Sequence, residues 1–359
     1  MNAVPQAAAA AALDDYTPRE TGDEGARVRA HRNESAFGAP PAVVDAVRSL
    51  GADDLRRYPA GRYEALARLV AERLGVDEAG VAFANGSDDL ILALAAAYLQ
   101  PGTNVAVVRP TFSMYARAAR LQGAGVREAA YPQRWRMDAR ALLGVCDERT
   151  RLVFLAHPAN PTGEYLDPAV VEGLLASLPQ AIVVVDEAYL AEPAKSYFGA
   201  VRGYDNLAVM ATLSKVAGLA GLRCGFGAAS PAVARAMRRV MQPHPLSAPA
   251  AVAMEAYFTS VYGDAAYRAA YRAFVSASLD SIAAELAPVA RVTRTQTNFL
   301  VLEFGERAAR VERALADAGI AVRTLGAEFD GGLRVNALSS DETAEFITVV
   351  KAALEVAHA

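Results

Sequence analysis

Lys215 stands where a lysine could act as a nucleophile, because it follows a predicted strand and precedes a glycine-bearing apolar loop. Of the 36 basic residues only three are lysine, Lys195, Lys215 and Lys351, so a lysine in apolar surroundings indicates chemistry that needs a deprotonatable amine. Burial lowers the pKa of a lysine, and its neutral amine can form a Schiff base with an aldehyde. Arg223 could hold an anion near the same place. The alternative is a surface lysine with Arg223 in a salt bridge.

A carboxylate, Asp186, ends an apolar run at residues 182–185 that predicts a buried strand. Ligands of open α/β sheets bind at the carboxyl ends of the strands. At that position Asp186 could pair with a protonated ring nitrogen, and the hydroxyl of Tyr189 could donate a hydrogen bond to a ring substituent. The alternative is that Asp186 caps the helix that follows.

Two further loops follow predicted strands. In one, Pro161 would hold the side chain of Asn160 rigidly, although Asn, Pro and Gly also make ordinary turns. In the other, the N–H groups of Gly86 and Ser87 would open a helix and form a seat for phosphate, with the carboxylate of Asp88 pointing away. Helix capping is the alternative there, and it is compatible with phosphate binding.

One arginine, Arg334, lies inside a short apolar strand predicted at residues 332–336. A guanidinium suits the bidentate recognition of a carboxylate. The alternative is a surface arginine on an edge strand.

The elements that must position these residues fall into two groups. Up to residue 265, β-branched runs alternate with helical stretches such as 88–99 and 168–178. The run at 182–185 is apolar throughout, which indicates strands buried on both faces of a mostly parallel sheet. We therefore predict a doubly wound α/β domain with seven strands, at 81–84, 104–108, 126–130, 151–156, 181–186, 207–212 and 223–228.

Beyond residue 265 the pattern is that of a smaller α+β domain. A helix at 265–286 precedes strands at 291–295, 298–303, 321–325 and 333–336, with helices at 306–318 and 341–356. The predicted organisation is an N-terminal arm at 1–40, a large domain at 41–265 and a small C-terminal domain at 266–359.

The composition excludes several classes of protein. The 359 residues carry 36 basic and 40 acidic side chains, a net charge of -4, which argues against binding to nucleic acid or to an anionic membrane. Two cysteines and four histidines fit neither a disulfide framework nor a zinc site, so no metal is expected. No uncharged apolar run reaches the roughly 20 residues of a membrane span, and the alanine-rich start lacks the basic region of a signal peptide. We expect a soluble, cytoplasmic protein.

Taken in order, these segments resemble the fold-type I, pyridoxal-phosphate-dependent aminotransferases of class I and II, and most of all their histidinol-phosphate aminotransferase branch. The resemblance runs from residue 33 to about residue 355 and rests on ten motifs in register. They are Arg-Tyr-Pro at 57–59, Asn-Gly-Ser-Asp-Asp at 85–89, Pro-Thr-Phe-Ser-Met-Tyr at 110–115, Asn-Pro-Thr-Gly at 160–163, Asp-Glu-Ala-Tyr at 186–189, Thr-Leu-Ser-Lys at 212–215, Gly-Leu-Arg at 221–223, Pro-Leu-Ser at 245–247, Thr-Asn-Phe at 297–299 and Leu-Arg-Val at 333–335.

The resemblance implies that pyridoxal phosphate is the cofactor, and that Lys215 forms the Schiff base with it and later moves a proton at the substrate. Asp186 would keep the ring nitrogen protonated, so that the ring can accept electrons. Asn160 and Tyr189 would bond the ring hydroxyl, and Phe112 would stack on the ring. The phosphate would be bound by the backbone of Gly86, Ser87 and Asp88, by the side chains of Thr212, Ser214 and Arg223, and by Tyr58 of the neighbouring subunit in a homodimer.

Substrate-binding residues are implied as well. Arg334 would bind an α-carboxylate or its equivalent, and Arg323 on the preceding strand would bind the substrate phosphate of the histidinol-phosphate branch. The chain departs from that branch around the substrate. Asn33 is followed by Glu-Ser-Ala rather than Glu-Asn-Pro, and His244 stands where tyrosine is frequent. Tyr16 matches the arm tyrosine that approaches the substrate.

The expected reaction is transamination between glutamate and an oxo substrate, either of the imidazole acetol phosphate type or belonging to an aromatic or specialised-metabolite amino acid. Lyases resembling threonine-phosphate decarboxylase and oxidative enzymes use the same scaffold and electron sink, so motifs do not separate them. A non-catalytic module, as in aminotransferase-like transcription regulators, is disfavoured because the arm is too short to hold a winged helix.

Overall fold

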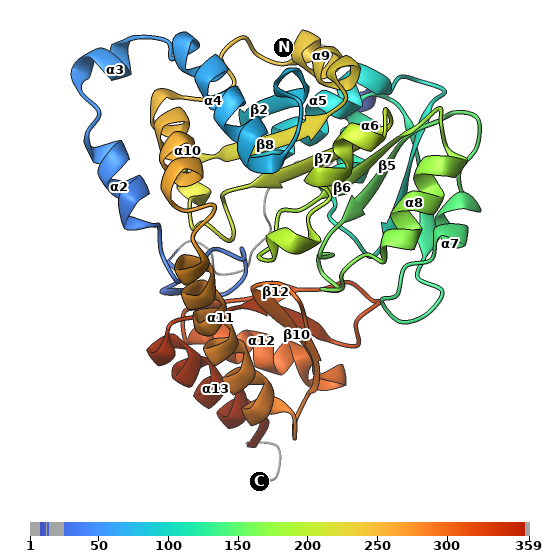
Figure 1. Ribbon diagram of the computed structural model, residues 1–359. Coiled ribbons are helices and arrows are strands. Elements are labelled where there is room, and N and C mark those ends of the chain that lie inside the picture. The colour runs from blue at the N-terminus through green and yellow to red at the C-terminus, as the bar shows by residue number, and fades with distance from the viewer. Residues whose placement is uncertain (1–7, 12, 14–24, 356–359) are drawn as a thin grey trace, which may run out of the picture.

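The large sheet contains the strands that the sequence predicts. In the computed structural model, which describes residues 8–11, 13 and 25–355, they lie in the order β2-β8-β7-β6-β5-β3-β4 (Figure 1). β8 is antiparallel to both of its neighbours and the other pairs are parallel, so the predicted doubly wound, mostly parallel, seven-stranded sheet is confirmed. The strands are β2 (Val81–Asn85), β3 (Asn104–Arg109), β4 (Gly125–Ala130), β5 (Thr150–Ala156), β6 (Ile182–Asp186), β7 (Leu207–Thr212) and β8 (Cys224–Ala229).

The strand β6 shows why its apolar run is continuous. Successive side chains of a strand point to opposite faces of the sheet. Val183 and Val185 belong to one buried cluster, and Ile182 and Val184 belong to another. Both faces of β6 are therefore covered, and only its last residue, Asp186, is polar.

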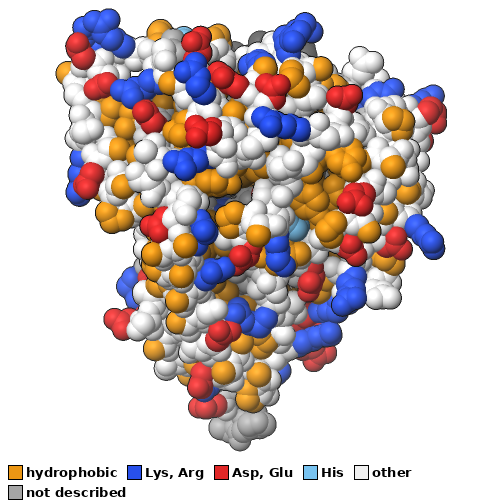
Figure 2. Space-filling view, in the orientation of Figure 1, with side chains coloured by type: hydrophobic (Ala, Val, Ile, Leu, Met, Phe, Trp, Pro, Cys, Tyr) orange, Lys and Arg blue, Asp and Glu red, His pale blue; other side chains and the backbone are white. Residues whose placement is uncertain are grey.

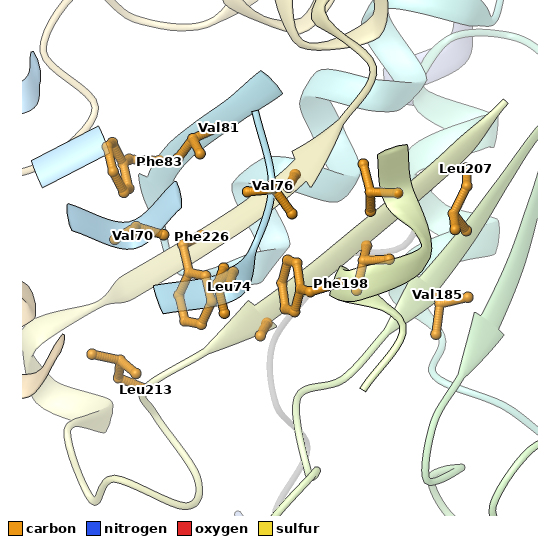
Figure 3. Packing of buried hydrophobic residues seen from close by; sticks show 14 of the residues in the cluster. Val70, Leu74, Val76, Val81, Phe83, Val185, Phe198, Leu207, Leu213 and Phe226 are labelled. Atoms are coloured by element: carbon orange, nitrogen blue, oxygen red, sulfur yellow. The ribbon is translucent and has the colours of Figure 1, made fainter. Parts of the chain in front are cut away.

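Helices cover the two faces of this sheet. Figure 3 shows part of one face, where residues from α4, β2, β8 and the 3₁₀ segment at 198–203 form one cluster. This face carries α2 (Pro41–Arg48), α4 (Ala60–Leu74), α7 (Ala139–Leu143), α8 (Pro168–Ser177) and α10 (Ala248–Ser260). The opposite face carries α5 (Ser87–Tyr98), α6 (Met114–Leu121) and α9 (Pro231–Val240). Outside these clusters lie the short helices α1 (Ala8–Ala11) and α3 (Ala52–Arg56).

A second, four-stranded antiparallel sheet lies below the large one in Figure 1, in the order β12-β13-β10-β9. Its strands are β9 (Arg291–Arg294), β10 (Phe299–Glu303), β12 (Arg323–Thr324) and β13 (Gly332–Asn336). It packs with α11 (Ala265–Leu286), α12 (Ala308–Asp317) and α13 (Ser340–Glu355) around its own buried cluster. The domain boundaries at residues 40 and 265 stay a proposal, which the start of α11 supports.

Most predicted strands agree with the observed ones to within one residue at each end, and two of the differences have a clear physical reason. The strand expected at 321–325 is divided, because β11 (Ile320–Ala321) pairs in parallel with β1 (Val28–Arg29) whereas β12 joins the four-stranded sheet. A single apolar run does not reveal that the chain changes its pairing partner after two residues. The strand expected from 223 begins at Cys224, because Arg223 adopts a left-handed conformation with φ of 55°.

Charged side chains of both signs, Lys and Arg among Asp and Glu, are mixed on the face of the molecule that Figure 2 shows. None of the helices in the described ranges combines the length and the apolar character needed to cross a membrane.

Candidate active site

The candidate site is a cavity at the edge of the large sheet where the parallel strands end. Because the carboxyl ends of parallel strands meet at one edge, residues that follow different strands come together there. Asp186 ends β6, Thr212 ends β7, Asn160 follows β5 and Phe112 follows β3. The cavity is lined by Ser87, Asp88, Phe112, Tyr115, Ala156, Asn160, Asp186, Ala188, Tyr189, Thr212, Ser214, Lys215 and Arg223.

Asp186 is buried in this cavity and has two hydrogen-bond donors. The hydroxyl of Tyr115 donates to Oδ2 at 2.8 Å, and the N–H of Ala188 donates to Oδ1 at 3.0 Å. Burial raises the pKa of Asp186 to about 6, although both hydrogen bonds favour the ionised form. The alternative of a helix cap does not hold, since no helix begins directly after this residue. Asp186 lines the cavity together with both residues that donate to it. An ionised Asp186 would suit a cationic ring nitrogen.

Tyr115 is a site residue that the sequence reasoning missed. Its ring is fully buried and stacks on Phe154 with centroids 4.6 Å apart. Burial raises the pKa of the Tyr115 phenol well above its usual value, so the hydroxyl stays a donor to Asp186. Its only signal in the sequence is its place at the end of the motif at 110–115, where it reads as one apolar residue of α6.

Lys215 follows β7 and is half-buried. Its Nζ donates a hydrogen bond of 2.8 Å to the backbone carbonyl of Arg32, and it lies 5.9 Å from the ring centroid of Tyr189. Within the described residues the amine thus contacts a neutral carbonyl, and Arg223 instead pairs with Asp88. The arrangement differs from the alternative of a surface lysine and leaves the amine at the cavity.

Ser87, Thr212, Ser214 and Arg223 of the cavity lining form a candidate anion seat. The hydroxyl of Thr212 donates to Ser214 Oγ at 2.9 Å, and Arg223 Nη1 donates to the same oxygen at 3.3 Å. The backbone N–H groups at the start of α5 open toward this place, beginning at Ser87. A helix N-terminus, two hydroxyls and a guanidinium are a donor set that fits a phosphate monoester.

Two glycines allow this close approach. Gly86 has φ of 87°, and a Cβ built on it would lie 2.3 Å from Arg223 Nη2. A Cβ on Gly225 would lie 2.3 Å from the backbone of Gly86. The carboxylate of Asp88 does not point away as expected, because its Oδ2 lies 3.5 Å from Arg223 Nη2. A guanidinium shared between a carboxylate and the seat explains why this carboxylate is tolerated there.

A chain of side-chain hydrogen bonds links the cavity to the small sheet. Asn160 and Asn33 both place an amide nitrogen near the hydroxyl of Tyr189, at 3.3 and 3.0 Å. Arg334 Nη1 donates to Asn160 Oδ1 at 2.8 Å, and Nη2 donates to the carbonyl of His31 at 2.6 Å. The alternative of an edge-strand arginine is wrong, because β13 lies between β12 and β10.

The lining of the cavity does not include Arg323, Tyr58 and His244. It does not include Gly86, Asn33 or Arg334 either, although these three contact residues that line it. Arg323 is paired in register with Arg334, so the two side chains leave the same face of the small sheet. Tyr58 is 77% exposed and stacks on His244 with centroids 4.2 Å apart. Tyr16 lies outside the described residues.

Within the described ranges no group of His, Cys, Asp and Glu is arranged to hold a metal.

A doubly wound sheet whose carboxyl edge holds a lysine, a buried carboxylate and a phosphate seat defines a fold-type I enzyme that uses pyridoxal phosphate. The chain belongs to the family of aminotransferases of class I and II, whose family model matches residues 30–350. It is a pyridoxal-phosphate-dependent aminotransferase, which acts on a small-molecule amino donor and an oxo acceptor. The bound cofactor supplies an electron sink for the bond broken at the substrate α-carbon.

The similar proteins include several histidinol-phosphate aminotransferases. That of Geobacillus thermodenitrificans is 34% identical over 81% of this chain and 80% of its own length. Histidinol-phosphate aminotransferase 2 of Pseudomonas fluorescens is 35% identical over 87% and 86%. Among solved structures, histidinol-phosphate aminotransferase from Sinorhizobium meliloti in complex with pyridoxal-5'-phosphate has a TM-score of 0.83 at 24% identity, with 92% and 91% coverage. At that identity the structure shows the shared fold.

Proposed function

We propose that the enzyme transfers the amino group of glutamate to imidazole acetol phosphate, giving histidinol phosphate. The observation that carries this proposal is the in-register pair of Arg323 and Arg334, whose side chains leave the same face of the small sheet. Arg334 contacts Asn160, which lines the cavity. Guanidiniums bind phosphates and carboxylates through charge-assisted hydrogen bonds. A phosphate on the acceptor and carboxylates on the donor would suit such a pair, and the names of the relatives agree with this substrate.

The sequence differs from the histidinol-phosphate branch next to Asn33 and at His244. These differences favour a second candidate, the transamination of an aromatic or specialised-metabolite amino acid. A lyase is not favoured. The relatives at 33 to 39% identity are aminotransferases, whereas threonine-phosphate decarboxylase from Porphyromonas gingivalis is similar at 20% identity and shows the fold alone.

Each side chain of the cavity has a proposed task. The amine of Lys215 would hold the cofactor aldehyde and, once released, would carry a proton between the substrate α-carbon and the cofactor C4′. Asp186 would keep the ring nitrogen protonated, and Asn160 and Tyr189 would bond the ring hydroxyl. Phe112 would stack on the ring face. The phosphate would be held by the backbone of Gly86, Ser87 and Asp88 and by the side chains of Thr212, Ser214 and Arg223.

The substrate is tested on the purified holoenzyme. Glutamate alone should bleach the visible absorption of the bound cofactor, and imidazole acetol phosphate should restore it. Arg323→Ala should raise KM for this acceptor by about 100-fold, since a charge-assisted phosphate contact is lost, and should change KM for glutamate much less. Bleaching without recovery by this acceptor, but with recovery by an aromatic oxo acid, would move the proposal to the second candidate.

We further propose a homodimer in which Tyr58 reaches the cofactor phosphate of the neighbouring subunit. Tyr58 is 77% exposed and its neighbourhood contains other exposed apolar side chains, Leu55 at 64% and Val240 at 46%. They border one groove together with His244. An exposed apolar groove of this kind supports contact with a second copy of the chain.

Mixing two inactive variants tests the shared site. A dimer of one Tyr58→Ala and one Lys215→Ala subunit would contain one site with neither change, so equal mixing should restore about a quarter of the wild-type activity. The control is a mixture of Lys215→Ala with Asp186→Ala subunits, in which every site lacks one residue. Equal activity of both mixtures, once subunit exchange is demonstrated by mass, would contradict the role of Tyr58.

A cytoplasmic location stays a proposal. Cys146 and Cys224 are both free thiols, and a reducing compartment favours that state.

A further inference from the structure

The loop at residues 131–137 leaves the large sheet after β4 and contacts the small sheet. Its indole, Trp135, stacks on Phe329 with ring centroids 4.7 Å apart and planes 23° apart. The ring of Tyr131 is perpendicular to that of Trp135, with centroids 5.7 Å apart. The guanidinium of Arg134 lies 4.9 Å from the centroid of the same indole. Three contacts therefore hold Trp135 where the loop after β4 meets the loop that carries Phe329.

Ion pairs reinforce this contact. Arg134 pairs with Glu303 of β10, whose side chain is only 3% exposed. The same carboxylate accepts a hydrogen bond of 3.1 Å from the N–H of Asp330. Nearby, Arg109 of β3 pairs with Glu328 at 3.1 Å. Arg291 lies 3.9 Å from the same carboxylate, at a longer distance than Arg134. Because the carboxylate is buried, the Arg134 pair ties the loop to the small sheet more strongly than a surface pair would.

The backbone of Trp135 indicates that this placement is maintained by its side chain. Its φ is 63°, in the left-handed region. A bulky residue is disfavoured in that region and persists where surrounding contacts compensate. The stacking on Phe329 and the contact with Arg134 are the compensating contacts that the structure shows.

The partner of Trp135 lies between the two substrate arginines along the chain. Phe329 is buried and belongs to the loop at 325–331, which joins β12 to β13. Arg323 stands before this loop and Arg334 after it, and the two face each other in register. A displacement of the loop would therefore displace both guanidiniums relative to Asn160, which Arg334 contacts at 2.8 Å.

We propose that Trp135, Arg134, Phe329 and Glu303 form a clasp that positions Arg323 and Arg334 at the cavity and so sets the affinity for anionic substrates. Its members are positioning residues, because they act through the two arginines. This inference rests on the proposed function, in which these arginines bind the substrate.

Steady-state kinetics of the holoenzyme test the clasp. Phe329→Ala should raise KM for glutamate by about tenfold and change kcat less than about threefold, because binding that is common to ground and transition state is lost. Trp135→Ala should do the same. Trp135→Phe should largely retain the wild-type KM, since the indole Nε1 has no hydrogen-bond partner among the described residues and the ring is the part that matters. Cofactor affinity should be unchanged in all three.

Trp135 also reports its own environment, because it is the single tryptophan of the chain. In Phe329→Ala its fluorescence emission should shift to the red, which shows that the clasp has opened without reference to activity. A red shift with unchanged KM would overturn the proposal. A lower melting temperature with unchanged KM would do so too, since it would leave only a structural role.

Two further variants keep the test decisive. Should Phe329→Ala not fold, Arg134→Ala carries the same test, and a KM that stays at the wild-type value would overturn the clasp. The matched control is Arg149→Ala, which removes an exposed arginine paired with Glu148 away from the cavity and should leave KM unchanged. Arg334→Ala separates the two proposals. Should KM rise in Arg334→Ala but not in the clasp variants, only the clasp fails, whereas an unchanged KM in Arg334→Ala contradicts the proposed function itself.

Discussion

Replacing Lys215 with alanine is expected to lower kcat by more than about 10⁴-fold, because both the covalent attachment and the proton transfer proposed for this amine are lost together. The fold should persist. The side chain is half-buried and the contact given up is a single hydrogen bond of 2.8 Å to the carbonyl of Arg32. The measurement is turnover of glutamate and an oxo acceptor, with circular dichroism to compare the fold.

Lys195→Ala is the matched control, since Lys195 is one of only three lysines in the chain. Its Nζ lies 4.0 Å from the ring centroid of Tyr165, and it does not line the cavity. We expect Lys195→Ala to keep near wild-type activity. Borohydride reduction should fix the cofactor to the peptide that contains Lys215 in the wild type and in Lys195→Ala, and to no peptide in Lys215→Ala. Activity above background in Lys215→Ala would rule out the assignment.

The meeting of the proposed cofactor-binding residues could be predicted because most of them end a strand or follow one closely. Asp186 and Thr212 end β6 and β7, Asn160 lies in the loop after β5, and parallel strands bring such ends together whatever the details of packing. The strands themselves were predictable for the same reason, since burial on both faces leaves a continuous apolar run. The positions of these residues relative to the strands in the sequence are therefore enough to predict that they lie close together.

The contacts between the two sheets could not be predicted in this way. The carbonyl of His31 and the side chain of Arg334 are 303 residues apart, and they meet only because β1 pairs with β11 beside the small sheet. A strand of two residues shows no alternation that a pattern could reveal. The clasp is equally invisible, because Trp135 and Phe329 read as isolated apolar residues in separate loops.

The charged residues of the site differ in sign and in burial. Arg223 lines the cavity beside the hydroxyl of Ser214, Arg334 reaches Asn160 from the small sheet, and Asp186 is the buried carboxylate. Anions at the two guanidiniums and a cation beside Asp186 would match the groups of a phosphorylated pyridinium and of an acidic substrate. A cation would matter most at Asp186, because burial opposes the charge of that carboxylate.

Asp186→Asn is accordingly expected to lower kcat by about 10²- to 10³-fold, the loss typical of one removed charge that stabilises the reacting state. The amide keeps the shape of the side chain but has no charge to keep the ring nitrogen protonated. Tyr115→Phe is the matched control. It removes the 2.8 Å hydrogen bond but leaves the carboxylate, so kcat should fall less than about tenfold. Equal losses in the two variants would contradict the charge argument.

The pH dependence of the apoenzyme gives the same test without turnover. Burial raises the pKa of Asp186 from 3.8 to about 6, so between these values the folded chain keeps a proton that the unfolded chain releases. The free energy of unfolding contributed by this group is therefore fully present below about pH 4 and is lost as the pH rises through about 6. Burial raises the pKa of Glu187 to about 8, and its pH-dependent contribution to the free energy of unfolding is the same in the wild type and in Asp186→Asn.

Denaturant unfolding of wild-type apoenzyme and of Asp186→Asn at pH 4 to 7 should thus show Asp186→Asn gaining relative stability as the pH rises. Added cofactor should remove that advantage, because its ring nitrogen compensates the ionised Asp186 in the wild type alone. A difference that is independent of pH would contradict the raised pKa of Asp186. A pH-dependent difference that the cofactor leaves unchanged would show that Asp186 does not meet the ring nitrogen.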